Sequence, residues 1–194
     1  MTTLHVTAEH VRAGRYVGPS LVAVQGDIEI AGNLGLVRFQ GSISATGSIT
    51  AGGNTSVEVC GSVVAGADII AGGSVVVAAT ITAGGRIAAC DSIVAARSIA
   101  ACGSIATMGI LKAGWGIGAG TSLEAGDGIS AGDDIEAETW IRAPWVRAEG
   151  QISAGTVTWR DLAPGDDEIR AELRGGTIAH GRLVPPTQAE RDDA

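Results

Sequence analysis

The sequence predicts an all-β fold, a three-sided parallel β-helix with about 18 residues per turn and a cap at its C-terminal end. The main observation is a fixed period: fifteen aliphatic residues stand six apart from Val57 to Ile141. Two residues after each of them stands a small side chain, which is Ala in twelve of the fifteen units. Because such a period is the signature of repeat architecture, we interpret each hexad as one strand and one corner.

Each hexad has the pattern of a short strand followed by a turn. The aliphatic residue and the small residue are two apart, so both point to the same side of an extended segment. Turn-forming residues such as Gly72-Gly73-Ser74 follow and bend the chain at low cost. Three such sides per turn bury both columns and pair each strand with the strand one turn away. An α-helix is disfavoured, because it separates residues i and i+2 around its axis and tolerates glycine poorly.

The pattern divides the chain into three parts. Strict hexads cover 57–143, and a less regular version extends the predicted solenoid to 1–160, with one lengthened corner at Asn54-Thr55. Residues 161–184 begin with the loop-forming run Pro164-Gly165-Asp166 and are assigned to an acidic loop and a cap. Residues 185–194 are polar, contain two prolines and are expected to form a flexible tail.

Charge and composition argue against some classes of function and favour others. A formal net charge of −8 and a pI near 4.8 argue against ordinary nucleic-acid binding and favour a cationic partner. No apolar stretch is long enough to span a bilayer, and residues 1–11 lack the pattern of a signal peptide, so we expect a cytoplasmic protein. The three cysteines fit a reducing compartment.

The cysteines share one slot of the hexad but not one corner of the coil. Cys60, Cys90 and Cys102 each stand three residues after the aliphatic residue. Their separations of 30 and 12 residues are not multiples of 18, so no two should stack directly. A ladder of disulfides is therefore not expected.

Residues that carry chemistry are scarce. The histidines are His5, His10 and His180, so the central solenoid contains no histidine base for acyl transfer. Hexapeptide acyltransferases place the small residue two positions before the aliphatic residue, where this chain has charged residues such as Asp91 and Arg97. A divergent acyltransferase is therefore disfavoured, and we expect no enzyme activity, no cofactor and no metal.

The repeat units resemble those of bactofilins, the bacterial polymer-forming cytoskeletal proteins. The resemblance covers roughly residues 28–160 and is carried by units such as Asp68-Ile69-Ile70-Ala71-Gly72-Gly73, Asp134-Ile135-Glu136-Ala137 and Trp140-Ile141-Arg142-Ala143. The solenoid of the flagellar assembly protein A family is also similar. The resemblance to bactofilins implies a right-handed three-sided solenoid that polymerises end to end without nucleotide.

The outward slots of the C-terminal half combine acids with tryptophans, and no basic residue lies between Lys112 and Arg142. The candidate partner-binding residues are Glu124, Asp127, Asp133, Asp134, Glu136, Glu138, Trp115, Trp140, Trp145 and Trp159. A docking surface for a basic protein, a solvated acidic face and a calcium site all fit the acids, and the tryptophans fit either recognition or the covering of a loop. Trp140 and Trp159 are close to one turn apart and are expected to stack.

Further towards the N-terminus the outward slots are apolar. Val64, Ile70, Val76 and Val94 are the candidate self-assembly residues, and a period of 18 places Val76 under Val94. Exposed apolar stripes usually contact another molecule. The alternative is that these positions are β-branched because such residues favour strands, without any contact.

Two functions of different class follow from the sequence. The first is a structural or scaffold protein that assembles with itself through its solenoid ends or faces. The second is an interaction module, such as an immunity or inhibitor protein that binds a basic toxin or enzyme through the acidic, tryptophan-containing half.

Overall fold

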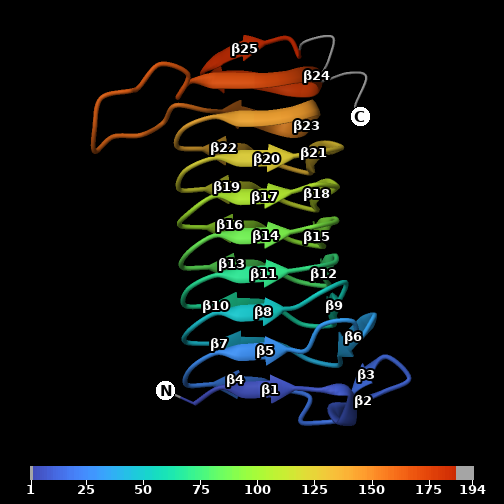
Figure 1. The fold of residues 1–194 in the computed structure, drawn as a ribbon. Helices are drawn as coiled ribbons and strands as arrows, with labels where there is room; N and C mark the ends of the chain where they lie inside the picture. Colours follow the sequence, from blue (N-terminus) through green and yellow to red (C-terminus); the bar gives the residue numbers. More distant parts are fainter. Residues whose placement is uncertain (1, 187–194) are drawn as a thin grey trace.

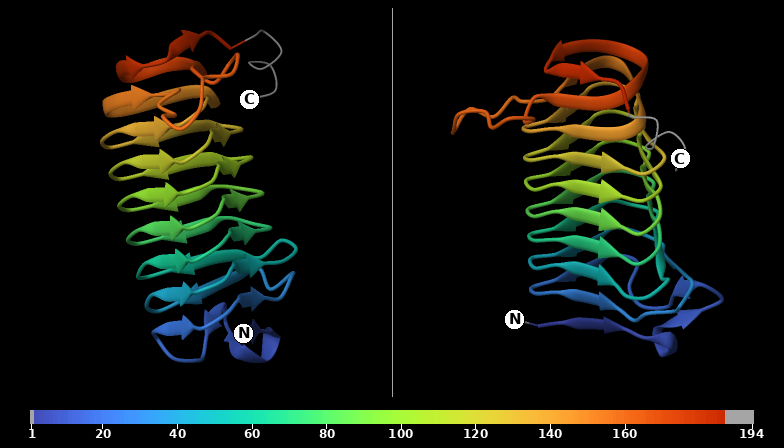
Figure 2. Two further views of the ribbon diagram at one scale, coloured as in Figure 1. Left: turned by 90° about the vertical axis from the view of Figure 1, so that its left-hand side faces the viewer. Right: turned by 45° about the horizontal axis from the view of Figure 1, so that its top comes forward.

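The computed structural model describes residues 2–186. They form a parallel β-solenoid of about nine turns with about 18 residues per turn, so the predicted fold class is confirmed (Figure 1). In Figure 1 the strands at the front run from left to right while the chain climbs and returns behind them, which makes the coil right-handed; both views of Figure 2 agree. A short 3₁₀ helix, η1 (Ala8–His10), lies near the N-terminus.

The strands stack in three ladders, which we call faces A, B and C. Face A contains β1 (Leu4–Val6), β5 (Ile28–Ile30), β8 (Ile49–Ala51), β11 (Ile69–Ala71), β14 (Ile87–Ala89), β17 (Ile105–Thr107), β20 (Leu123–Ala125) and β25 (Arg182–Val184). Face B contains β3 (Arg15–Tyr16), β6 (Leu36–Phe39), β9 (Ser56–Val59), β12 (Val75–Val77), β15 (Ile93–Ala95), β18 (Ile110–Ala113) and β21 (Gly128–Ala131).

Face C contains β4 (Val22–Val24), β7 (Ile43–Ala45), β10 (Val63–Ala65), β13 (Ile81–Ala83), β16 (Ile99–Ala101), β19 (Ile117–Ala119) and β22 (Ile135–Ala137). Two longer strands, β23 (Ile141–Ser153) and β24 (Glu168–His180), each run past all three faces at the C-terminal end. β2 (Val11–Arg12) forms an antiparallel hairpin with β3 below face B.

The interior consists of the two columns that the hexads predict. Neighbouring strands pair in register, for example Ile81 with Ile99 and Ala83 with Ala101, so equal side chains stack along the axis. The aliphatic residues and alanines of the strict hexads are at most 8% exposed, and Thr107, in the small-residue slot, is 6% exposed. A period of six therefore fills a narrow core with one large and one small side chain per strand.

Corner residues satisfy backbone groups of the next turn. The Ser56 Oγ accepts the N–H of Ser74 at 3.1 Å, and the Ser92 Oγ accepts the N–H of Ile110 at 3.2 Å. An aspartate does the same at other corners, where Asp68 Oδ1 accepts the N–H of Arg86 at 2.8 Å. Polar residues before the aliphatic slot thus replace strand hydrogen bonds where the chain bends.

The lengthened corner at Asn54-Thr55 is held from inside. The Thr55 side chain is fully buried, donates to the carbonyl of Ala31 at 2.9 Å and accepts the N–H of Leu34 at 3.1 Å. One hydroxyl therefore ties the wide corner at residues 52–55 to the wide corner of the turn before it.

The ladder extends past the boundary expected at residue 160. After a projecting loop at residues 154–167, β24 continues the same three faces, and Ile169 pairs with Ile141 on one side and Leu183 on the other (Figures 1 and 2). The segment expected to be a loop and cap thus closes the coil with solenoid strands. Of the expected tail at 185–194, residues 187–194 lie outside the described part of the chain.

Candidate interaction surface

The three-sided coil distributes consecutive outward residues over different faces. The acids were predicted as one group, but they are distributed around most of one turn. Glu124 lies on face A and Glu136 on face C. The others lie at corners: Asp127 between A and B, Asp133 and Asp134 between B and C, and Glu138 between C and A. Two of them have internal partners. Asp134 Oδ1 accepts the N–H of Gln151 at 2.6 Å, and Glu138 Oε2 accepts the indole N–H of Trp159 at 3.1 Å. The structure therefore does not gather these carboxylates into one patch.

The tryptophans are also spread around the coil. Trp115 lies at the corner between B and C, Trp140 at the corner between C and A, Trp145 at the corner between A and B, and Trp159 on the projecting loop. Trp115 and Trp159 are the most exposed, at 55% and 69%. Within residues 2–186 the stacked aromatic pair is Tyr16 with Phe39, and the expected stacking of Trp140 on Trp159 is not present there.

An arginine covers each tryptophan ring. The guanidinium carbon of Arg142 lies 4.4 Å from the ring centroid of Trp140, and that of Arg97 lies 5.3 Å from Trp115. The other two pairs are Arg160 over Trp159 at 5.3 Å and Arg174 over Trp145 at 5.1 Å. The predicted set of partner-binding residues did not include these arginines. Two of them come from neighbouring turns and two from positions within two residues of the tryptophan in the sequence. They place positive charge beside the acids.

The candidate self-assembly residues fall on all three faces. Val76 pairs directly with Val94 on face B, as the period of 18 predicts, but Glu58 and Lys112 stand on either side of this pair. Val64 lies on face C and Ile70 on face A. The apolar run is therefore a belt around the coil and not a single stripe.

An apolar stripe of three residues does occur on face A. Ile70, Ala88 and Ala106 pair in order along the ladder. Their spacing of 18 residues agrees with this alignment, although Ala88 and Ala106 were not among the candidate self-assembly residues.

Face A is hollowed along its length. A hollow of about 440 Å³ surrounds His5, Glu29 and Thr50, one of about 400 Å³ lies over Ala88 and Ala106, and one of about 350 Å³ lies at the C-terminal end. Ile70 lines both of the first two, and Glu124 lines both of the last two. The three hollows therefore follow one another in a row along face A, with Ile70 and Glu124 between them, and we call this row the face A groove.

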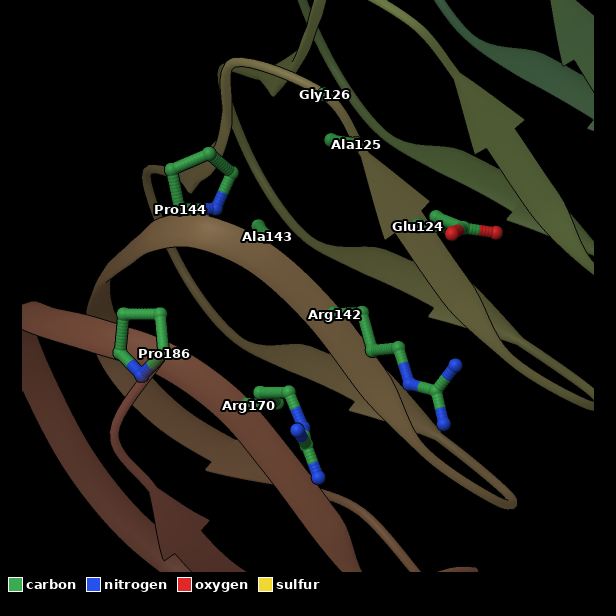
Figure 3. Close-up of a pocket in the computed structure, with 8 residues that line it drawn as sticks. All are labelled: Glu124, Ala125, Gly126, Arg142, Ala143, Pro144, Arg170 and Pro186. Atoms are coloured by element: carbon green, nitrogen blue, oxygen red, sulfur yellow. The ribbon is translucent and has the colours of Figure 1, made fainter. Parts of the chain in front are cut away.

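The C-terminal end of this groove is charged. Figure 3 shows Glu124, Arg142 and Arg170 side by side on three successive strands, with the rings of Pro144 and Pro186 along one side. Arg170 is held by Glu168 at 3.2 Å, and Glu168 also accepts a bond from Arg182 at 2.9 Å. These two arginines hold the pKa of the Glu168 carboxyl below its usual range, so it stays ionised.

The thiols lie at three different corners, as their spacing predicts. Cys60 is at the corner between B and C, Cys90 at the corner between A and B, and Cys102 at the corner between C and A. All three are exposed and free. Cys90 lines the middle of the face A groove, beside Met108, whose side chain is 68% exposed.

Comparison with known proteins adds no relative. No protein-family model, no curated protein and no solved structure matches this chain.

The described part of the chain has neither a membrane-spanning helix nor a cluster of metal ligands. No helix within residues 2–186 is long and apolar enough to cross a membrane. Within the same residues, no group of three or more His, Cys, Asp or Glu side chains has the arrangement of a metal site.

Proposed function

We propose that this protein is a non-enzymatic structural or scaffold protein that assembles with itself through the ends of its solenoid. The observation that carries the proposal is the uncovered strand edge at each end of face C. Within the described residues, β4 pairs with β7 alone, and residues 177–180 of β24 pair with β23 alone. Uncovered edges of this kind are templates for pairing with another chain.

The hydrogen bonds of β4 identify the groups that such pairing would use. The N–H of Val22 donates to Ser42, and the carbonyl of Val24 accepts from Thr46, so both point towards β7. Because successive residues of a parallel strand alternate in direction, the N–H and carbonyl of Ala23 point to the uncovered edge. A second solenoid stacked end to end continues the same ladder there.

Direct observation of assemblies tests the proposal. We expect negative-stain microscopy and sedimentation of the purified protein to show end-to-end oligomers or filaments. Ala23→Pro removes the edge N–H and should shorten them, whereas Ala23→Ser keeps that N–H and serves as the matched control. Wild-type protein without any end-to-end species, at concentrations that populate them in similar solenoids, would contradict the proposal.

The alternative of an immunity or inhibitor protein has less support. Its predicted surface requires the acids and tryptophans to lie together, whereas they follow the coil around its corners and several have partners within the chain.

A further inference from the structure

We infer that the face A groove is a second, lateral interface, at which two copies of this chain pair face to face with their axes antiparallel. The inference rests on the proposed self-assembly in that the occupant is a second copy, but it uses a different surface from the solenoid ends. It is argued from the order of the outward residues along face A, from their charges and from the size of the face.

The outward residues of face A have complementary halves. From the N-terminal end they are His5, Glu29, Thr50, Ile70, Ala88, Ala106, Glu124, Arg142, Arg170 and Val184. Ala88 is the residue about which the first nine members are evenly distributed. We place a twofold axis at Ala88, in the plane of the face and parallel to its strands. A residue a given number of strands before Ala88 then lies opposite the partner's residue the same number of strands after Ala88.

The pairs formed in this way are compatible. Glu29 lies opposite the partner's Arg142, Thr50 lies opposite the partner's Glu124, and Ile70 lies opposite the partner's Ala106. Opposite charges therefore meet at Glu29 and the partner's Arg142, apolar surface meets apolar surface in the middle, and His5 lies opposite the partner's Arg170 at the outermost position. The guanidinium carbon of Arg142 lies 4.4 Å from the ring centroid of Trp140. An arginine over an aromatic ring can still donate to a carboxylate.

Neighbouring registers are unfavourable. Moving the axis half a strand spacing towards the C-terminus places Ile70 against the partner's Glu124, which buries a carboxylate against an apolar side chain. Moving it the same distance towards the N-terminus places Glu29 against the partner's Glu124, two like charges. Of these three registers, the one with the axis at Ala88 has neither an apolar side chain against a carboxylate nor two carboxylates against each other.

The corner beside the groove fits the same arrangement. At the corner between A and B, Gly72, Cys90 and Met108 follow one another in successive turns. The axis at Ala88 places the exposed Met108 side chain against the partner's Gly72, which has no side chain. It also places Cys90 against the partner's Cys90.

The face is large enough for a stable contact. The nine strands of face A from β1 to β24, which face each other in this arrangement, make a ladder about 40 Å long at about 4.8 Å spacing. Six residues of extended chain give each side a width of at most about 20 Å, so the footprint is at most about 800 Å² per copy. This is the area that a stable interface between two proteins buries on each partner.

Matched substitutions test the interface. β14 and β16 have the same sequence, Ile-Ala-Ala, but β14 lies on face A and β16 on face C. We expect Ala88→Glu to raise the dissociation constant of the lateral dimer by roughly 10-fold or more in analytical ultracentrifugation, and Ala100→Glu to leave it unchanged. Both measurements use the Ala23→Pro background, in which pairing through the solenoid ends is weakened.

Charge reversal and cross-linking provide independent readouts. Glu29→Arg and Arg142→Glu should each weaken the dimer, and the double variant should restore it. In wild-type protein a short bismaleimide, matched to the ~10 Å spacing of packed sheets, should link Cys90 to Cys90 and leave Cys60 and Cys102 unlinked between copies.

The outcomes separate the two proposals. A monomeric Ala23→Pro protein, cross-linking through Cys60 or Cys102 in place of Cys90, or equal effects of Ala88→Glu and Ala100→Glu would each overturn the lateral interface. None of these results bears on filaments formed through the ends. Conversely, a lateral dimer without end-to-end species would overturn the proposed function and leave this inference intact.

Discussion

At the scale of single residues, tight contacts between neighbouring turns explain several glycines of the corners. A Cβ at Gly128 would lie 2.2 Å from the indole ring of Trp145, which packs over it from the next turn. A Cβ at Gly118, in the middle of β19, meets no atom within 4 Å. The missing side chain of Gly128 therefore makes room for the Trp145 ring, whereas that of Gly118 makes room for no neighbour.

We expect Gly128→Ala to lower the free energy of unfolding by about 1–3 kcal/mol, because the Trp145 ring must move away from its place under Arg174. Gly118→Ala is the matched control and should have no destabilising effect. Urea unfolding followed by circular dichroism measures both, and tryptophan fluorescence reports the displaced ring. Equal stability of the two variants would show that the Trp145 contact does not restrict this position.

At the scale of elements, the projecting loop at 154–167 is fastened by one carboxylate. Asp166 Oδ2 accepts bonds from Arg160 Nη1 and from the N–H of Ala163, each at 2.6 Å. The Arg160 side chain, followed by the Ala163 N–H, holds the pKa of Asp166 below its usual range. Arg160 also covers Trp159, whose indole N–H binds Glu138, so the fastening reaches back to the coil.

Acid should weaken the contacts that hold this loop. Because the pKa of Asp166 is lower in the folded protein than in the unfolded chain, its contribution is complete above the ordinary aspartate pKa of about 3.9 and is lost as the pH falls through the lower folded value. The nuclear magnetic resonance signal of the Trp159 indole N–H should shift over that range.

The variant Asp166→Asn should move the same Trp159 signal at neutral pH, because the carboxylate that binds Arg160 is gone. Asp161→Asn changes an exposed residue of the same loop and should leave the signal in place. A signal that does not respond to Asp166→Asn would mean that other contacts hold the loop.

At the scale of the whole molecule, each turn contacts mainly the turns next to it. β16 pairs with β13 on one side and β19 on the other, and the same holds for each strand of the strict hexads. Stability in such a coil is close to a sum over turns and their interfaces. A local defect should therefore have a local effect.

We expect Ile99→Ala to destabilise its surroundings by about 2–5 kcal/mol, because Ile99 is 1% exposed and its loss leaves a cavity. Hydrogen exchange should lose most protection in β13, β16 and β19, and little in β1 and β25. Thr82→Ala, on the exposed side of β13, is the control. An equal loss in every strand would show that the coil unfolds as one unit.

Much of the fold follows from the sequence alone. The hexads of 57–143 determine a short strand, a corner and a buried pair of columns, because one period repeats without interruption and each unit faces the same narrow interior. The three corners of Cys60, Cys90 and Cys102 follow from the same count. Outside the strict hexads the strand register could not be predicted from the period. Leu4 pairs with Ile28, and Ile141 pairs with Ile169, across corners of irregular length.

The exterior follows from the sequence only in part: the period of 18 aligns outward residues of the strict hexads, but the hollows, the arginine–tryptophan contacts and the uncovered end strands were decided by the tertiary structure. A coil with three sides separates neighbours in the sequence and brings together residues one turn apart, so the acidic run winds around the corners while Ile70, Ala88 and Ala106 meet on one face. The face A groove and the uncovered edges at the two ends both arise from this arrangement. The sequence by itself determined the interior, because one repeating period governs burial, whereas the surfaces depend on pairings between distant segments.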